Sequence, residues 1–153
     1  MTRVDNYIVN YETLLLIPNG ESETKVFEMD QEFLVKKRIG DIIKDSCLFF
    51  GSSYEGRRDG TKSLLNCSIK VPIILEDSRN LIIFPTHSFK NQNNIWVVYN
   101  NIVNYKKYDF ENTVFMFRNN NDIKVNVRYN IIDNQIVRCL KMEAILKKRK
   151  ELK

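Results

Sequence analysis

The segment Leu48-Phe49-Phe50-Gly51-Ser52-Ser53-Tyr54-Glu55-Gly56-Arg57-Arg58-Asp59-Gly60-Thr61 is the most informative part of this 153-residue chain. An aromatic pair is followed by three glycines, two adjacent hydroxyl side chains and two arginines. The glycines predict an irregular loop, because glycine adopts backbone conformations that other residues avoid. We expect the aromatic end of this loop to be attached to the core and its cationic end to bind an anionic partner.

The cationic end of the segment suits a nucleic acid. Arginine and lysine pair with phosphates and enter narrow minor grooves, hydroxyl groups add neutral donors, and glycines let the backbone come close. The candidate DNA contacts are three cations and four hydroxyl groups: Arg57, Arg58, Lys62, Ser52, Ser53, Tyr54 and Thr61. The same spacing also fits a tight turn whose arginines meet Glu55, Asp59 or solvent, and both interpretations stay open.

Positive charge is concentrated toward the C-terminus. Residues 128–153 carry eight Lys and Arg against three Asp and Glu, whereas residues 1–127 carry equal numbers of both. Residues 128–153 therefore supply the whole net charge of +5. A neutral body with a basic end indicates a nucleic acid, an acidic protein or a solvated tail as its surroundings. Lys147, Lys148 and Arg149 join the candidate DNA contacts, since they would extend a cationic surface around the central segment.

Short apolar runs separated by turn residues predict a protein built mainly of strands. The expected strands are residues 7–17, 25–29, 73–75, 81–84, 95–99, 113–117 and 123–127. A short helix is expected at about 35–45, and an amphipathic helix is expected from Asp133 or Asn134 into the basic run. We therefore predict an α+β fold, with mainly antiparallel short strands, one short central helix and a C-terminal amphipathic helix.

Length and composition point to a single domain over residues 1–153, since 43% of the chain is hydrophobic and supports one core. The chain has neither an apolar stretch of roughly 18 residues nor a signal-peptide pattern, and we expect a cytoplasmic protein. The aromatic residues of the apolar runs are expected in the core: Phe49, Phe50, Phe84, Trp96, Phe115 and Phe117. The tyrosines expected to reach the surface are Tyr99, Tyr105, Tyr108 and Tyr129.

Sequence motifs of catalysis and metal binding are absent. There is no GxSxG, HExxH or Walker pattern, and Cys47, Cys67 and Cys139 are too scattered for a disulfide framework or a CxxC zinc site. We predict no catalytic residue, no cofactor and no metal. The alternative is an enzyme acting on nucleotides or RNA, which would require the single histidine, His87, or acidic residues to converge in a pocket.

The central segment also resembles a known family. Phe49-Phe50-Gly51-Ser52-Ser53-Tyr54, followed by Gly56-Arg57 and Gly60-Thr61, is similar to the central part of the ComK family, the competence transcription factors of Gram-positive bacteria. The likeness continues in the same order through four further matches, at Pro72-Ile73, Phe84-Pro85-Thr86, Trp96 and Asn134-Gln135. It covers about residues 46–140, and Arg57 matches the family pattern directly, whereas Arg58 and Lys62 are candidates from charge and position.

The resemblance implies a DNA-binding transcriptional activator of genes for DNA uptake and recombination. Family members bind paired A/T-rich boxes largely through the minor groove, as dimers that pair on the site, and an adaptor delivers them to a Clp protease. The expected partners are therefore A/T-rich double-stranded DNA, further copies of the chain, RNA polymerase and such an adaptor. When bound, the protein would be associated with the nucleoid.

Members of the family typically continue past the position of Lys153 into a tail that carries the adaptor-docking motif and contributes to activation. The resemblance therefore implies DNA binding more directly than adaptor control or full activation. The alternative is a protein-interaction module, a short paralogue that modulates a full-length regulator by forming hetero-oligomers.

Overall fold

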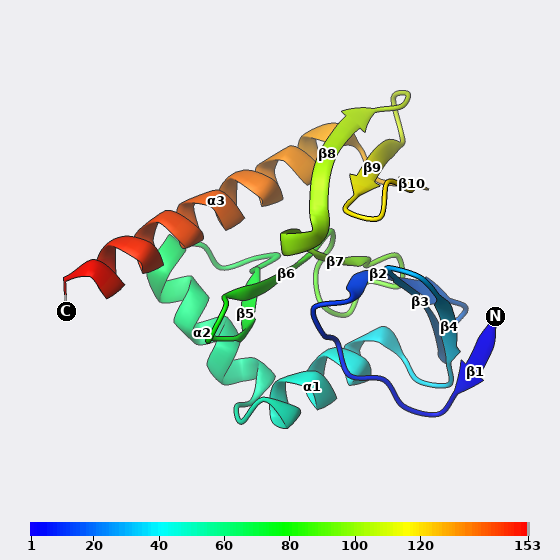
Figure 1. The fold of residues 1–153 in the computed structure, drawn as a ribbon, viewed down its shortest axis with the longest axis horizontal. Coiled ribbons are helices and arrows are strands. Elements are labelled where there is room, and N and C mark those ends of the chain that lie inside the picture. The colour runs from blue at the N-terminus through cyan, green and yellow to red at the C-terminus, as the bar shows by residue number, and fades with distance from the viewer. Residues whose placement is uncertain (153) are drawn as a thin grey trace.

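The computed structural model describes residues 1–152, which form ten strands, three α-helices and one 3-10 turn (Figure 1). The strands are β1 (Thr2–Val4), β2 (Thr13–Asn19), β3 (Glu23–Glu28), β4 (Glu32–Val35), β5 (Ile73–Glu76), β6 (Leu81–Pro85), β7 (Trp96–Val98), β8 (Ile102–Lys107), β9 (Thr113–Phe117) and β10 (Asp122–Val125). The helices are α1 (Ile39–Phe49), α2 (Tyr54–Leu65) and α3 (Tyr129–Glu151), and the 3-10 turn is η1 (Tyr99–Asn101). The predicted α+β fold class is confirmed. None of the described helices is long and apolar enough to cross a membrane.

Seven strands form the larger sheet, in the order β1-β4-β3-β2-β7-β6-β5. All neighbours are antiparallel except β1 and β4, which are parallel. In the middle of the sheet, Leu15 pairs with Val97 and Leu16 pairs with Trp96. This pairing of β2 with β7 joins strands β1 to β4 to strands β5 to β7.

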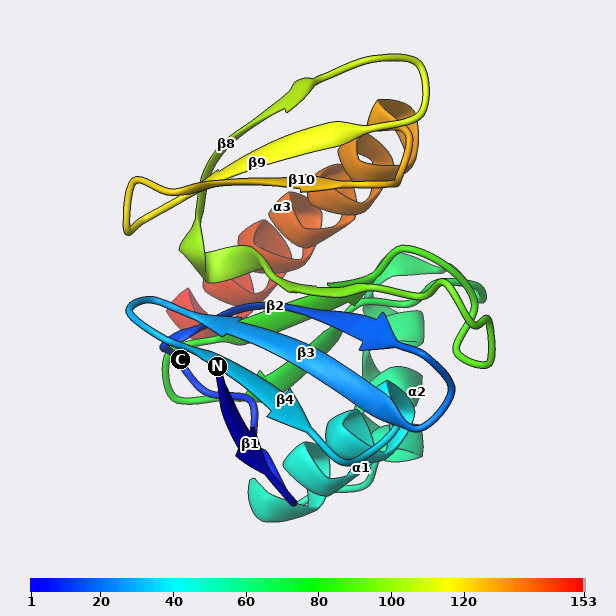
Figure 2. The ribbon, with the colours of Figure 1, turned by 90° about the vertical axis from the view of Figure 1, so that its right-hand side faces the viewer.

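The alternation of side chains along β2 creates two cores, because successive residues of a strand point to opposite faces. Leu16 and Trp96 face the first core, together with α1 and the start of α2. Leu15 and Val97 face the second core, together with the smaller sheet and α3. Figure 2 shows the result: α1 and α2 lie on one side of the larger sheet, while β8, β9, β10 and α3 lie on the other.

The smaller sheet has the order β10-β9-β8 and is antiparallel throughout. Phe115 and Phe117, two residues apart on β9, are completely buried and contribute to the second core. The helix α3 presents one apolar stripe to the same core, made of Ile132, Ile136, Cys139 and Met142. The smaller sheet and α3 thus form one layer, which covers one face of the larger sheet (Figure 2).

Several sequence expectations are confirmed, and others move by a few residues. The hairpins β5–β6 and β9–β10 lie where the apolar runs predicted them. The first long strand begins at Thr13 and not at Tyr7, because the hydroxyl of Thr13 accepts a hydrogen bond from the Asn10 amide (3.0 Å) and ends a turn there. The first helix begins at Ile39 and not at Val35, because Val35 still pairs with Thr24 in the sheet.

The prediction of an irregular loop over the central segment is wrong beyond Ser53, because residues 54–65 form the helix α2. Gly56 and Gly60 each cost about 1 kcal/mol in a helix interior relative to alanine. Two features offset this cost: Ser53 caps the helix, and Tyr54 and Thr61 lie against the body of the protein. The fold therefore has two central helices where the sequence predicted one.

The C-terminal helix begins at Tyr129, with Arg128 at the N-cap position, and not after Asp133 or Asn134. Asp133 lies inside the helix, where its carboxylate accepts a hydrogen bond from the Tyr105 hydroxyl (2.7 Å). The Asp133 carboxylate therefore bonds to Tyr105 of β8 and does not cap the helix.

The predicted division of aromatic residues between core and surface holds with one exception. Four of the six expected core rings are buried, namely Phe84, Trp96, Phe115 and Phe117, and Phe50 is partly buried against the first core. Phe49 is instead 68% exposed, although its neighbours in sequence are apolar. Among the tyrosines expected at the surface, Tyr108 is exposed and the other three are partly buried.

Candidate nucleic-acid interface

A sharp corner connects α1 to α2 and positions the central segment. Gly51 adopts a φ of +89°, a conformation that side chains disfavour, and its amide donates to the carbonyl of Leu48 (3.0 Å). The next amide, that of Ser52, donates to the carbonyl of Cys47 (3.0 Å). The hydroxyl of Ser53 then accepts a hydrogen bond from the Gly56 amide (2.9 Å), which caps α2. Ser52 and Ser53, both predicted DNA contacts, therefore lie at the N-terminus of α2, where Ser53 is the N-cap.

Tyr54 and Thr61 lie on the inward face of α2. The Tyr54 ring packs at 4.4 Å from the Phe89 ring and lies edge-on to Trp96 at 6.3 Å. Burial raises the pKa of Tyr54 to about 12, and the charge of Arg58 opposes this shift. Thr61 is only 1% exposed, and its hydroxyl has no hydrogen-bond partner among the described residues. These two predicted contacts hold α2 in place in this conformation, and their side chains are not displayed to a large ligand.

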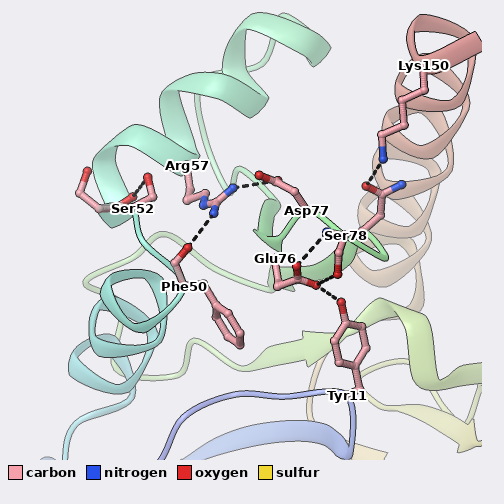
Figure 3. A network of polar contacts seen from close by, with 10 residues as sticks. Tyr11, Phe50, Ser52, Arg57, Glu76, Asp77, Ser78 and Lys150 are labelled. Carbon is pink, nitrogen blue, oxygen red and sulfur yellow. Dashed lines mark hydrogen bonds and ion pairs between the residues drawn. The ribbon is translucent and has the colours of Figure 1, made fainter. Parts of the chain in front are cut away.

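Arg57 connects three parts of the chain (Figure 3). Its guanidinium donates to the carboxylate of Asp77 in the β5–β6 turn (2.9 Å) and to the carbonyl of Phe50 (3.5 Å). The Arg57 side chain is 15% exposed, whereas that of Asp77 is 74% exposed, and Arg57 Nε is buried without a hydrogen-bond partner within residues 1–152. The arginine that matches the family pattern thus holds the α1–α2 corner against the larger sheet.

Arg58 and Lys62 form a separate pair on another side of α2. Consecutive helix residues are rotated by about 100°, so Arg57 and Arg58 leave the helix in different directions, whereas Arg58 and Lys62 are one turn apart. Both are partly exposed, and neither forms an ion pair with another described residue. Exposed Glu55 and Asp59 lie next to them along the helix, so the surface of α2 carries mixed charge.

The third group of candidates lies at the end of α3. Lys147, Lys148 and Arg149 are all exposed in the last turns of this helix, where cations are favoured by the helix dipole. Lys150, in the same basic run, donates to the side-chain oxygen of Asn80 in the β5–β6 turn (3.1 Å), and Arg57 of α2 bonds to Asp77 of that turn (Figure 3). The basic end of α3 and the N-terminal part of α2 therefore lie on either side of this turn.

A polar network at the β5–β6 turn was not foreseen from the sequence (Figure 3). The Tyr11 hydroxyl donates to the carboxylate of Glu76, which also accepts from the Ser78 amide and hydroxyl (2.8 Å each). These bonds, that of Tyr11 first, lower the pKa of Glu76 from 4.5 to about 2. The Arg79 guanidinium stacks 3.8 Å from the centre of the Tyr11 ring. Because Tyr11 and Glu76 are distant in sequence, no local pattern could indicate their contact.

The single histidine lies in a different region, at the end of β6. Its ring Nδ1 is 2.8 Å from the hydroxyl of Thr86, and burial, followed by the charge of Lys70, lowers the pKa of His87. No group of three or more His, Cys, Asp or Glu side chains within residues 1–152 is arranged to hold a metal ion.

Comparison with known proteins agrees with these features. The family model described as ComK protein matches residues 4–151 of the chain. The competence transcription factor of Bacillus subtilis (strain 168) is 32% identical over 138 residues, which cover 88% of this chain and 72% of that relative. No solved structure gives a significant match. The chain therefore belongs to the ComK family.

Proposed function

We propose that this protein is a sequence-preferring DNA-binding regulator that activates transcription of competence and DNA-uptake genes. It acts by binding, in the cytoplasm and on the nucleoid, and its target is A/T-rich duplex read through the minor groove. The observation that carries the proposal is the family match over nearly the whole chain, with a curated relative described as a competence transcription factor.

The surface charge supports a polyanionic partner. Cations of α2 and of the end of α3 lie on two elements that flank the β5–β6 turn (Figure 3), and the proposed contacts are Arg58, Lys62, Lys147, Lys148 and Arg149. Exposed lysines and arginines bind phosphates and supply most of the affinity of a protein for DNA. Ser52 and Ser53 belong to the same proposed interface through their position at the start of α2. Arg57 contributes by fixing the corner, since its guanidinium is already bound to Asp77.

Reading through the minor groove is supported by the distribution of charge on α2 and α3. A/T tracts have a narrow minor groove with strong negative potential, which attracts inserted cations without requiring hydrogen bonds to base edges. The α3 helix ends in a dense basic run, whereas the N-terminal turns of α2 carry Glu55. Such a distribution favours phosphate and groove-shape contacts over the base-edge contacts of a recognition helix in the major groove.

Further partners of the regulator are also proposed. Paired A/T boxes call for two or more copies of the chain, and α3 leaves Val137 and Leu140 exposed (44% and 53%) on a face that a second copy would cover. RNA polymerase is the proposed target of activation, and an adaptor of a Clp protease is the proposed route of control.

The experiment that tests the proposal is fluorescence anisotropy with two labelled duplexes, at roughly 50 and 200 mM salt. One duplex carries two A/T tracts about one helical turn apart, and the other is a G·C-rich control of equal length. We expect a preference for the A/T duplex that persists at the higher salt. If the protein binds both duplexes equally and this binding disappears at the higher salt, the cationic residues attract DNA non-specifically. That result would overturn the proposed sequence preference. Absence of binding would favour the interaction module described above.

A further inference from the structure

We propose that Phe49, at the corner between α1 and α2, inserts between stacked base pairs of the bound duplex and kinks it. This inference rests on the proposed function, because it assumes that a duplex lies against this corner. It goes further by assigning an apolar contact and a deformation of the DNA to a residue outside the cationic set.

The corner displays two large apolar side chains to solvent. Leu48 is 65% exposed and Phe49 is 68% exposed, and they are adjacent at the end of α1. Single exposed apolar residues are common on protein surfaces, whereas a contiguous pair at a projecting corner indicates a binding site. The pair remains outside although Phe50, the next residue, packs against the first core.

Phe49 is held in a defined position. Its ring packs edge-on against the Phe50 ring, with 5.1 Å between ring centres and 87° between ring planes. Phe50 is in turn fixed by the core and by the Arg57 guanidinium, which bonds to its carbonyl. The backbone turns away immediately afterwards at Gly51, so the chain does not fold back over Phe49. An inserting side chain requires this kind of rigid support, because a mobile ring would lose more entropy on insertion.

The flanks of the corner suit the phosphates that border an opened base step. Lys44 precedes Leu48 by one helical turn, and its ammonium lies 5.5 Å from the centre of the Phe89 ring. Phe89 packs on Tyr54, the first residue of α2, so Lys44 lies near the start of that helix. From the other side, Arg58 lies close enough to Tyr54 for its charge to affect that residue's pKa. Lys44 therefore lies one turn before Leu48 on α1, and Arg58 lies one turn after Tyr54 on α2.

The chemistry of this arrangement matches a minor-groove wedge. Proteins that bind the minor groove frequently insert Phe, Leu or Ile between base steps and kink the duplex by roughly 20–90° toward the major groove. Pyrimidine–purine steps, TA above all, are the easiest to unstack. The occupant of the corner is therefore a TA step within an A/T-rich duplex, with Leu48 lying against the sugar edges beside the inserted ring.

The test measures bending separately from binding. A duplex with one central TA step in an A/T-rich context carries a fluorescence donor and acceptor at its ends, and energy transfer is compared for the parent protein, Phe49→Ala and Phe110→Ala. Phe110 is the matched control, because it is 67% exposed and lies in the β8–β9 turn, far from the corner in Figure 1. We expect the parent and Phe110→Ala to increase energy transfer, and Phe49→Ala to lose the increase while binding about tenfold more weakly.

The other outcomes are equally informative. Bending by Phe49→Ala equal to that of the parent would overturn the wedge, and so would loss of bending in Phe110→Ala alone, which would move the insertion to the β8–β9 turn. A parent protein that prefers A/T duplex without bending it overturns the wedge and leaves the proposed function intact. A parent protein that shows no preference between A/T-rich and G·C-rich duplexes would overturn both the wedge and the proposed function. Equal melting temperatures of the three proteins exclude misfolding as the cause, as expected for exposed side chains.

Discussion

The guanidinium of Arg57 donates a hydrogen bond to the carboxylate of Asp77 at 2.9 Å, and so ties the helix α2 to the turn between β5 and β6. The two side chains differ in environment, since Arg57 is 15% exposed and Asp77 is 74% exposed. A largely buried cation depends on its few partners, whereas an exposed carboxylate is also solvated by water. Loss of Asp77 would therefore leave the Arg57 guanidinium largely buried with one long hydrogen bond, to the Phe50 carbonyl (3.5 Å).

Arg57→Ala should lower the free energy of unfolding by about 1–3 kcal/mol, because it removes charged hydrogen bonds to Asp77 and to the Phe50 carbonyl. Asp77→Ala should lower it by a similar amount, because it leaves the largely buried Arg57 guanidinium without its carboxylate partner. Urea denaturation of both variants measures the two losses. A stable Arg57→Ala protein that has lost affinity for A/T duplex would show instead that Arg57 is a direct DNA contact.

Arg58→Ala and Lys62→Ala should each weaken duplex binding without affecting stability, because neither side chain has an ion-pair partner among the described residues. If each contacts one phosphate, the slope of log affinity against log salt should fall by about one per substitution. Arg3→Ala, on β1 at the edge of the larger sheet, removes the same charge as a control. An equal loss for Arg3→Ala would mean that net charge, and not the position on α2, sets the affinity.

Replacing Lys147, Lys148 and Arg149 together by glutamine should reduce the same salt slope by about two to three if each contacts one phosphate, since all three are exposed at the end of α3. The substitutions should also destabilise the last turns of α3 slightly, because cations favour a helix C-terminus. Anisotropy at several salt concentrations measures the first effect, and circular dichroism the second. An unchanged slope would exclude this end of α3 from the interface.

Thr61→Val should raise the free energy of unfolding by about 1 kcal/mol. The Thr61 hydroxyl is buried without a partner among the described residues, and an unsatisfied buried polar group costs about 1–3 kcal/mol. Valine has nearly the same shape, although it has a lower helix propensity than alanine, as threonine does. The midpoint of urea unfolding measures this change. A destabilised variant would indicate that the hydroxyl makes a hydrogen bond.

Glu76→Gln should flatten the acid limb of the stability profile. In the folded protein the pKa of Glu76 is lowered to about 2, chiefly by the hydrogen bond from Tyr11, so its ionised form favours folding. This contribution is complete above pH 4.5, the ordinary value of the group, and is lost as the pH falls from there through about 2. Melting temperatures between pH 6 and 2 should therefore fall more steeply for the parent than for the variant. Parallel curves would contradict the assigned shift.

The sequence predicts best where local pattern and tertiary environment agree. The hairpin of β5 and β6 follows from two apolar runs around a charged turn, and that of β9 and β10 from alternation around an asparagine-rich turn. The helix α2 could not be predicted in this way, because Gly56 and Gly60 argue against a helix and the segment has no regular apolar stripe. Its stability depends on contacts to Phe89 and Trp96, which are distant in sequence.

The candidate site shows the same limit. Sequence alone selects Arg57 and Arg58 equally, since both are cations in one motif. Their different roles depend on the helix between them: a rotation of about 100° places one against Asp77 and the other on a separate side. Phe49 was expected in the core because hydrophobicity was the only available guide, and its exposure depends on the turn that begins at Gly51.

The pairing of β2 with β7 has a consequence for synthesis of the chain. Strands β1 to β4 leave the ribosome first, but Leu15 and Leu16 have no partners on their open side until Val97 and Trp96 have been translated. Until then the nascent chain carries an unpaired strand edge flanked by apolar residues, which is a typical starting point for aggregation. Completion of the larger sheet therefore waits for more than half of the protein, and a ribosome stalled before Trp96 holds a chain that needs protection by chaperones.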